Sequence, residues 1–307
     1  MARFVARRLL LAIPVIIGAS FIVFFLVYAL PGDPIRALAG DRPLPPGVEA
    51  ELRDRFNLDD NVFVQYAKYM GNLLQGDLGV DFSGREVSDT IARRLPVTAR
   101  LAVAALVIEA VIGLVAGILA GIRRNGYLDN LVLVSTTLLV SIPVFVFGYV
   151  AQYFLGVQLE WFPISSVNDG WYSYVLPGFV LASASMAYVA RLTRTSLAEN
   201  MRTDFVRTAR AKGLPERTVV GKHALRNSLI PVVTFLGADF GALMSGAIVT
   251  EGIFNIPGLG GAVFDAVKSQ EGSLVVGITT FFIFVYIFFN LAVDVLYAAL
   301  DPRIRLD

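Results

Sequence analysis

Cysteine is absent from this chain of 307 residues, and histidine occurs only once, as His223. The missing cysteine excludes disulfides and thiolate metal sites, and a single histidine excludes metal sites built on two. The sequence also lacks the Gly-x-x-x-x-Gly-Lys-Ser/Thr phosphate loop and the Gly-x-Ser-x-Gly nucleophile turn. We therefore expect no enzyme activity, no ATP hydrolysis and no bound cofactor or metal, and we expect His223 to pack or cap locally.

Charge is also scarce: charged residues make up 17% of the chain, hydrophobic residues make up 56%, and the mean hydropathy is +0.66. Six stretches carry the roughly 18–20 apolar residues that a helix needs to cross a bilayer. They are residues 9–30, 97–122, 128–155, 174–192, 229–250 and 274–300. The pattern predicts an all-α membrane protein with six transmembrane helices, in which Pro14 and Pro143 are expected to kink their helices.

The positive charges are distributed unevenly along the chain. They gather at Arg3, Arg7 and Arg8, at Arg123 and Arg124, at nine Lys/Arg residues in 191–227, and at Arg303 and Arg305. Residues 32–96 hold eleven acids instead. Because basic loops stay in the cytoplasm, we expect both termini there and residues 32–96 outside. A cleaved signal peptide is the alternative for residues 1–30, but the apolar run is longer than such peptides carry.

These features divide the chain into four parts. Residues 1–31 form the first span, 32–96 an extracytoplasmic segment, 97–300 a five-helix core and 301–307 a cytoplasmic tail. Within the extracytoplasmic segment, residues 48–56 and 62–74 are expected to be helical. The second of these helices carries an apolar stripe of Phe63, Tyr66, Tyr69, Met70 and Leu73, suited to packing on the membrane or on neighbouring spans.

Small residues recur every fourth position in two of the spans. The second span has Gly113, Gly117 and Gly121, and the fifth has Gly237, Gly241 and Ser245. Such stripes allow helices to approach closely in lipid. For the second span, packing inside the chain is the favoured interpretation, and a subunit interface or a pathway wall is the alternative. For the fifth span, the preference for packing is less clear.

The basic segment at 191–228 contains one short amphipathic helix, expected at residues 204–212 and ended by Gly213 and Pro215. A helix of this length is not stable alone in water, so we expect it to dock on another surface. The alternative is a basic loop that only fixes topology and touches anionic lipid.

Three acids lie inside the apolar spans: Glu109, Asp239 and Asp294. Intramembrane acids are typical of ion-driven transport, which keeps an ion-coupled secondary transporter or channel open as an alternative. Glu109 needs a partner, Asp239 lies beside the Gly237/Gly241 stripe and could face a polar pathway, and Asp294 is expected to have a structural role. No Lys or Arg lies beside these acids in the spans, which argues against a proton relay.

Five motifs, taken in order, resemble one transporter family. They are Leu-Pro-Gly-Asp-Pro at 30–34, Gly-Asp-Leu-Gly at 76–79 leading to Leu-Pro-Val-Thr at 95–98, Arg-Thr-Ala-Arg-Ala-Lys-Gly at 207–213 followed by His-Ala-Leu-Arg at 223–226, Thr-Glu-Gly-Ile-Phe-Asn-Ile-Pro-Gly-Leu-Gly at 250–260, and Leu-Asp-Pro-Arg-Ile-Arg at 300–305. Together they resemble the B-type permease subunit of dipeptide and oligopeptide ABC importers. Arg207 and Thr208 replace Glu and Ala of the general ABC-importer loop signature, as in the peptide branch.

The resemblance implies a type I ABC importer permease fold and a set of partners. These are a second, C-type permease, two ATPase subunits that bind ATP and Mg, an extracytoplasmic peptide-binding protein and membrane lipid, with no nucleic acid. The chain would form half of a peptide pathway in the cell membrane; permeases for nickel complexes or glutathione are alternatives within the family. The resemblance assigns ATPase coupling to residues 204–213, namely Asp204, Phe205, Arg207, Thr208, Ala209, Arg210, Ala211, Lys212 and Gly213.

A glycine-rich turn follows the fifth span at residues 251–261. Four glycines and one proline predict a loop of defined turns there rather than a continuing helix. We expect an outer gate at this turn, with Glu251, Phe254, Ile256, Pro257, Gly258 and the preceding Asp239 as pathway candidates. A plain connecting turn is an equally weighted alternative.

Overall fold

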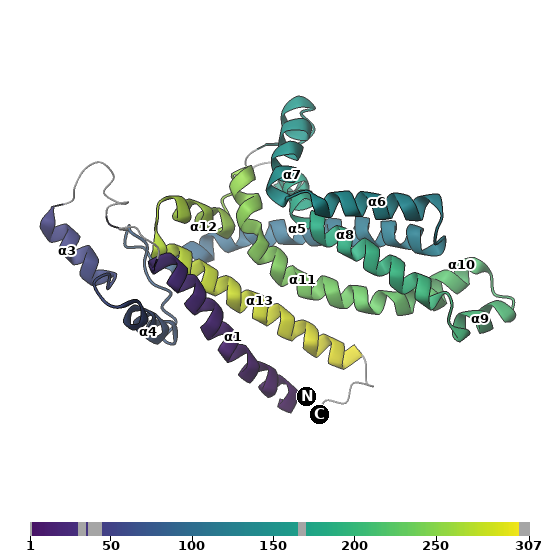
Figure 1. Cartoon of the computed structure of the whole chain (residues 1–307), viewed down its shortest axis with the longest axis horizontal. Helices are drawn as coiled ribbons and strands as arrows, with labels where there is room; N and C mark the ends of the chain where they lie inside the picture. Colours follow the sequence, from purple (N-terminus) through teal and green to yellow (C-terminus); the bar gives the residue numbers. More distant parts are fainter. Residues whose placement is uncertain (1, 30–34, 36–44, 165–169, 301–307) are drawn as a thin grey trace.

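The computed structural model describes residues 2–29, 35, 45–164 and 170–300 (Figure 1). The predicted motif at 30–34 and most of the motif and tail at 300–307 lie outside these residues. The described part is helical and has no strands. Its helices are α1 Ala2–Tyr28, α3 Pro46–Arg55, α4 Val62–Leu73, α5 Val87–Ile122, α6 Tyr127–Ser141, α7 Val144–Ala151, η1 Gln152–Gln158, η2 Gly170–Tyr174, α8 Val175–Asn200, α9 Asp204–Ala211, α10 Glu216–Thr218, η3 Val219–Ala224, α11 Leu225–Phe254, α12 Leu259–Lys268 and α13 Gly272–Leu300.

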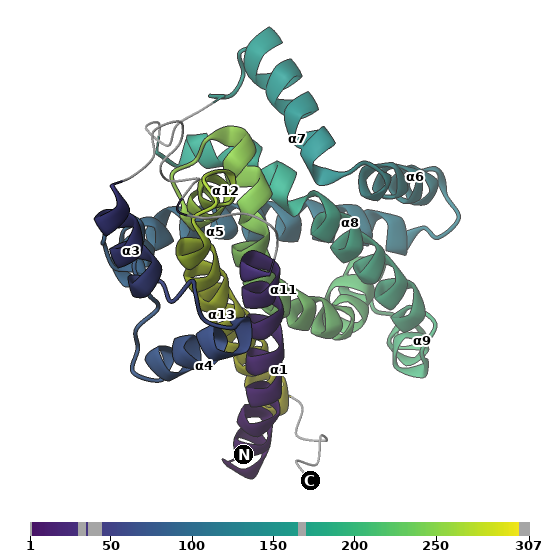
Figure 2. The same cartoon turned by 60° about the vertical axis from the view of Figure 1, so that its left-hand side comes forward.

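Five of the expected spans are single helices or helical runs long and apolar enough to cross a membrane. The expected third span, 128–155, is wrong as one helix. α6 and the run from Val144 to Gln158 meet at an angle of 102°. Pro143 is the cause: the residue before a proline is pushed out of the helical region, and Ile142 is extended with φ −92° and ψ 124°. Figures 1 and 2 show α7 projecting away from α6 at this break, while Gly148 of α7 still lies against Val180 of α8 and Ile253 of α11. Pro14, by contrast, lies within an uninterrupted α1.

The second span is longer than the apolar run alone predicts. α5 has 36 residues, which is about 54 Å of helix against a hydrocarbon thickness of roughly 30 Å. It begins at Val87, so its first turns, with Arg93 and Arg94, extend beyond the apolar stretch.

The glycine stripe of α5 packs against α8. A Cβ atom added at Gly117 would lie 2.5 Å from the Ala190 carbonyl oxygen, and one at Gly113 would lie 2.7 Å from the side chain of Val189. These distances are shorter than van der Waals contact, so only glycine lets the two helix backbones come this close. The packing prediction for the second span is therefore supported by the structure.

The stripe of the fifth span packs inside the chain as well. A Cβ atom at Gly237 would lie 2.6 Å from the side chain of Val293, and one at Gly241 would lie 3.2 Å from Phe289, both on α13. The two glycines are therefore occupied by α13 and offer no surface to another subunit at these positions.

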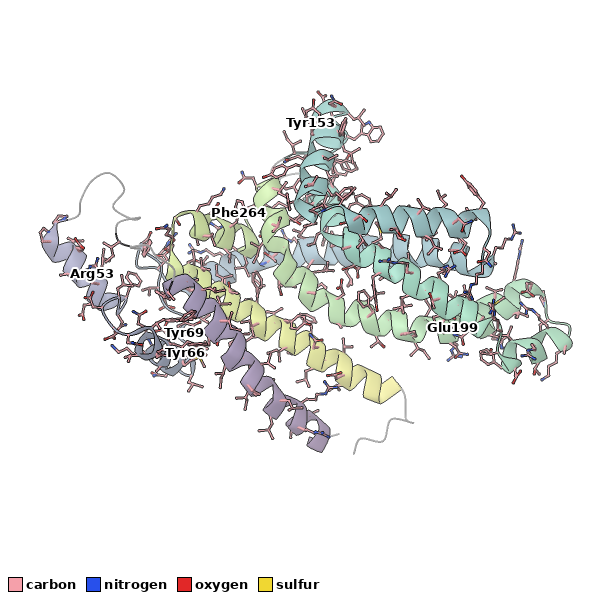
Figure 3. All side chains as sticks on the ribbon, in the orientation of Figure 1. Arg53, Tyr66, Tyr69, Tyr153, Glu199 and Phe264 are labelled. Atoms are coloured by element: carbon pink, nitrogen blue, oxygen red, sulfur yellow. The ribbon has the colours of Figure 1, made fainter. Side chains whose placement is uncertain are left out.

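The segment before α5 folds over one end of the bundle, where α12 also lies (Figures 1 and 2). The predicted stripe of α4 does face neighbouring spans (Figure 3). The Tyr66 hydroxyl donates to the Ile17 carbonyl of α1 at 2.9 Å, and the Tyr69 hydroxyl lies 2.9 Å from that of Thr280 on α13. Burial raises the pKa of Tyr69 to about 12, so it stays a neutral anchor.

α9 and α10 lie at the opposite end of the bundle (Figure 1). The structure therefore places the two regions that the sequence singled out, residues 204–213 and 251–261, at opposite ends of the long helices α8 and α11. The first turns of α1 and the end of α13 are joined by an ion pair, Arg8 to Asp294 at 2.9 Å.

Candidate functional site

The predicted short helix forms as α9, Asp204–Ala211. Asp204 is in its first turn, where a negative charge favours the helix, and Arg210 is in its last turn. Gly213 follows with φ +75°, a conformation that residues with a Cβ atom rarely adopt. The sequence thus predicted both the position of this helix and its stop.

α9 has an inner and an outer face. Val206 and Ala209 are 0% and 5% exposed and pack in one cluster with Leu197 of α8 and with Val219 and Ala224 of η3. The other predicted coupling residues lie on the exposed side: Asp204, Phe205, Arg207, Thr208, Arg210, Ala211, Lys212 and Gly213. Ala209 therefore supports α9 from beneath and contacts its own chain.

The outer face combines one large apolar side chain with several charges. Phe205 is 41% exposed. Around it, Arg207 pairs with Asp204 at 3.4 Å and Arg210 pairs with Glu216 at 2.6 Å. The hydrogen bond to Glu216 raises the pKa of Arg210 further above its ordinary value, so this guanidinium stays charged. An exposed aromatic residue within a charged rim is typical of a protein-docking surface.

A buried ion pair holds the base of this end of the bundle. Asp129, at the start of α6, accepts from Nε and an NH2 group of Arg194 on α8 at 2.5 and 2.7 Å, and from the Asn125 N–H at 2.7 Å. The exposed fractions of the two side chains are 1% for Asp129 and 15% for Arg194. Sequence analysis missed this pair, because the residues are distant in the chain and lie near separate span ends.

At the opposite end, Glu251 organises the glycine turn. Its side chain is fully buried, and Oε2 accepts from the Gly261 N–H at 2.8 Å. A Cβ atom at Gly258 would lie 2.4 Å from the same carboxylate, so glycine is needed for the turn to close over it. The turn is shorter than expected at both ends: α11 continues through Phe254 and helix resumes as α12 at Leu259, so the expectation of a loop over residues 251–261 is wrong.

The two apolar gate candidates lie inside the chain. Phe254 and Ile256 are 1% and 2% exposed and share a cluster with Leu101, Tyr174 and Leu176. Asn255 and Pro257 are the exposed residues of the turn. In this conformation the turn is thus firmly packed on the ends of α5 and α8.

Comparison with known proteins identifies the chain. Residues 113–306 match the family model "Binding-protein-dependent transport system inner membrane component", and residues 1–102 match the model for its N-terminal part. The chain belongs to this family. It is therefore a permease component of ABC transporters and a multi-pass protein of the inner membrane. Family membership sets aside the ion-coupled secondary transporter.

The permease resembles its relatives along its whole length. It is 40% identical to the "Glutathione transport system permease protein GsiC" of Escherichia coli strain K12, over 306 residues and 99% of each chain. The proteins of the same name from Shigella dysenteriae serotype 1 and Shigella boydii serotype 4 are 40% and 39% identical, with the same coverage. Permeases of this family work with a partner permease, an ATPase and a binding protein.

The intramembrane acids of the permease have neighbours within the chain: Glu109 lies beside Asp239, and Asp294 pairs with Arg8. Glu109 is fully buried and interacts with Asp239 of α11, which in turn is hydrogen-bonded to Ser185 of α8. Neither oxygen of Glu109 reaches good hydrogen-bond geometry with any described residue. Sequence analysis singled out both residues but not their pairing, and it missed Arg8 as the partner of Asp294.

Proposed function

We propose that this permease forms half of the translocation pathway of an ATP-driven importer of short peptides, and that α9 couples it to an ATPase subunit. The observation that carries the coupling role is the two-faced packing of α9. Its inner face is fixed to α8 and η3, while its outer face presents Phe205 and a charged rim that no other described part of the chain covers.

The same proposal orients the chain. α9, the N-terminal end of α1 and the C-terminal end of α13 belong in the cytoplasm. These regions carry the excess of Lys and Arg, which stays on the cytoplasmic side of a membrane. The glycine turn, α12 and the acidic segment before α5 then face outward. ATP and Mg belong to the two ATPase subunits; a C-type permease and an extracytoplasmic binding protein complete the importer.

For the substrate, we infer a short peptide, with the tripeptide glutathione as the specific candidate. The support is the name shared by the relatives, which are 40% identical over 99% of both chains. Nickel complexes have no comparable support here.

We also propose that the glycine turn is the outer closure of the pathway. Phe254 and Ile256 are buried in the chain's own core in this conformation, so the proposal requires the turn to leave this packing when the pathway opens. Glu251 would hold the turn together while it moves, since its buried carboxylate binds the start of α12. The alternative of a plain connecting turn predicts that Phe254 affects stability alone.

The coupling role is tested by Phe205→Ala in the importer assembled with its partner permease, ATPase subunits and binding protein. Loss of an exposed aromatic anchor should weaken ATPase binding by about tenfold or more and reduce ATP-driven peptide uptake, while the chain still inserts. The matched control is Tyr127→Ala, which removes an aromatic residue that is 80% exposed and lies outside α9.

Full uptake by Phe205→Ala would refute the coupling role. Ala209→Asp is not a clean test, because Ala209 faces the interior and a charge there would disrupt the chain's own packing. Absence of ATP-dependent uptake of any peptide by the unmodified importer would refute the transport function itself.

A further inference from the structure

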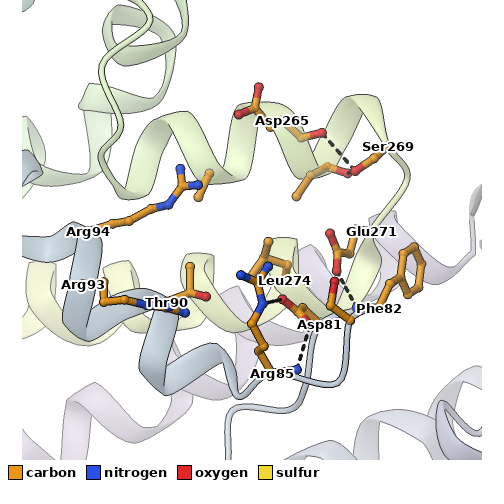
Figure 4. A pocket seen from close by; sticks show the side chains of 13 residues that line it. Asp81, Phe82, Arg85, Thr90, Arg93, Arg94, Asp265, Ser269, Glu271 and Leu274 are labelled. Carbon is orange, nitrogen blue, oxygen red and sulfur yellow. Dashed lines mark hydrogen bonds and ion pairs between the residues drawn. The ribbon is translucent and has the colours of Figure 1, made fainter. Parts of the chain in front are cut away.

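A cavity of about 590 Å³ lies at the end of the bundle opposite α9, between the start of α5, α12 and the start of α13 (Figure 4). Its volume falls within the range of small-molecule binding sites, about 300–1,000 Å³. Its walls are charged, however, which is unusual for an apolar ligand. Neither the coupling helix nor the proposed closure uses this space.

The charges are segregated across the cavity. Arg93 and Arg94 come from α5, whereas Asp265 and Glu271 come from α12 and the turn before α13. Figure 4 shows Arg94 and Glu271 on opposite sides of the space. The cavity therefore has a cationic wall and an anionic wall that face each other.

A further pair in the wall is already satisfied. Asp81 is 3% exposed and accepts from both the N–H and the Nε of Arg85, at 2.8 and 2.9 Å. These two groups neutralise each other and form the rigid side of the cavity. They leave the arginines of α5 and the acids of α12 and α13 as the groups that can bind a ligand.

Those remaining groups are held mainly by main-chain contacts. Arg93 donates to the Asp89 carbonyl at 3.2 Å, and Arg94 donates to the Gly258 carbonyl at 3.4 Å. Glu271 accepts from the Phe82 N–H with Oε1 at 2.6 Å. Within the described residues none of the three forms a salt bridge. Arg94 also faces the buried carboxylate of Glu251. Each side chain is thus positioned by the fold and has no ion-pair partner within 4 Å among the described residues.

The geometry points to a binding site for a small zwitterion, with the carboxylate of a short peptide on Arg93 and Arg94 and its amino group on Glu271 and Asp265. A ligand with only a negative charge would be repelled by the two acids. An apolar ligand would remove water from all four charged side chains and would form no hydrogen bonds in its place. A ligand with opposite charges at its two ends satisfies both walls, because charge-assisted hydrogen bonds are the strong ones.

The position of the site suits a substrate that has not yet entered the membrane. The first turns of α5 extend beyond the apolar stretch, and Arg94 links the cavity to Gly258 in the turn that Glu251 holds. This inference rests on the proposed function for the outward orientation and for the peptide substrate class. It adds a receiving site on the permease itself, next to the proposed closure.

The test uses the full chain in lipid nanodiscs and equilibrium dialysis with radiolabelled dialanine. We expect saturable binding at about 1 mM or tighter. Arg94→Gln and Glu271→Gln should each weaken binding by about tenfold, since a hydrogen bond to a charged group is worth at least that factor. Glutamine at 271 can still accept from Phe82, so the fold is preserved. Arg100→Gln is the control, because Arg100 is exposed on α5 but does not line the cavity.

Blocked peptides assign the two walls. N-acetyl-dialanine keeps only the carboxylate, so Arg94→Gln should weaken its binding, whereas Glu271→Gln removes a like charge and should not weaken it. Dialanine amide keeps only the amino group and should show the opposite dependence. A structural effect of either variant would weaken both blocked peptides equally, which would overturn the assignment.

Two other results would overturn the inference. No saturable dialanine binding up to about 10 mM would exclude the site. Normal dialanine binding by the variants, with a loss of binding-protein affinity in the assembled importer, would make the cavity a docking socket for that protein. Neither result bears on the proposed function, which is tested separately by ATP-dependent uptake.

Discussion

Removing Arg194 tests the structural base of the coupling helix. Asp129 is 1% exposed and has three hydrogen bonds, two from the Arg194 guanidinium and one from the Asn125 N–H. Arg194→Met keeps an unbranched side chain on α8 but removes both guanidinium bonds. The carboxylate of Asp129 is then left buried with a single donor.

The size of the effect follows from that geometry. Breaking a buried ion pair by removing one partner costs about 3–5 kcal/mol. The exposed fraction of Arg194, 15%, and the surviving Asn125 bond place this pair at the lower end, near 3 kcal/mol. Each kcal/mol corresponds to about 2–4 °C, so the midpoint of thermal unfolding should fall by roughly 6–12 °C. Circular dichroism of the protein in detergent measures this midpoint.

Two comparisons make the reasoning refutable. Arg210→Met removes an exposed ion pair, with exposed fractions of 42% and 58%, and should change stability by no more than about 1 kcal/mol. The double variant Asp129→Leu, Arg194→Met removes the stranded charge and should recover most of the loss. If Arg194→Met resembles Arg210→Met, or if the double variant is less stable than Arg194→Met alone, the buried pair does not hold this end of the bundle.

Three further changes test other parts of the molecule. Gly117→Ala puts a methyl group 2.5 Å from a carbonyl oxygen of α8 and should lower the free energy of unfolding by about 1–3 kcal/mol. Gly18→Ala is the control, because its methyl group meets no atom within 4 Å. Equal melting temperatures of the two variants would contradict the close α5–α8 packing. In intact cells, a cysteine at Ser83 should react with an impermeant thiol reagent and one at Ala211 should not; the reverse would overturn the orientation. Phe254→Ala should cost about 3–5 kcal/mol and raise the ATPase activity of the assembled importer without its binding protein, and unchanged ATPase activity would favour a plain turn.

Sequence reasoning located the elements that have a strong local signal. The apolar runs predicted the spans, and the stop at Gly213 predicted the end of α9. The first turns of α5 were missed, because Val87 to Pro96 are polar enough to lack a transmembrane signal although they continue the same helix. The proline at 143 predicted a kink, but its angle depends on what α6 packs against and is not encoded locally.

Contacts between distant segments could not be read from the sequence. Ala209 and Phe205 lie one turn apart, and only the packing of α9 on Leu197 shows that the first faces inward and the second outward. The Asp129–Arg194 pair likewise joins α6 to α8 through residues that are 65 positions apart in the chain. The cavity charges come from four separate segments and are invisible as a motif.

The packing of α9 on its own chain also has a mechanical consequence for the proposed coupling. Because Val206 and Ala209 are clamped between Leu197 and Ala224, α9 is ordered before any partner binds, and docking loses little additional chain entropy. A close-packed contact of this kind transmits displacement instead of absorbing it. Under the proposed coupling role, we therefore expect a shift of the ATPase surface to move the ends of α8 and α11 together with α9 as one rigid unit.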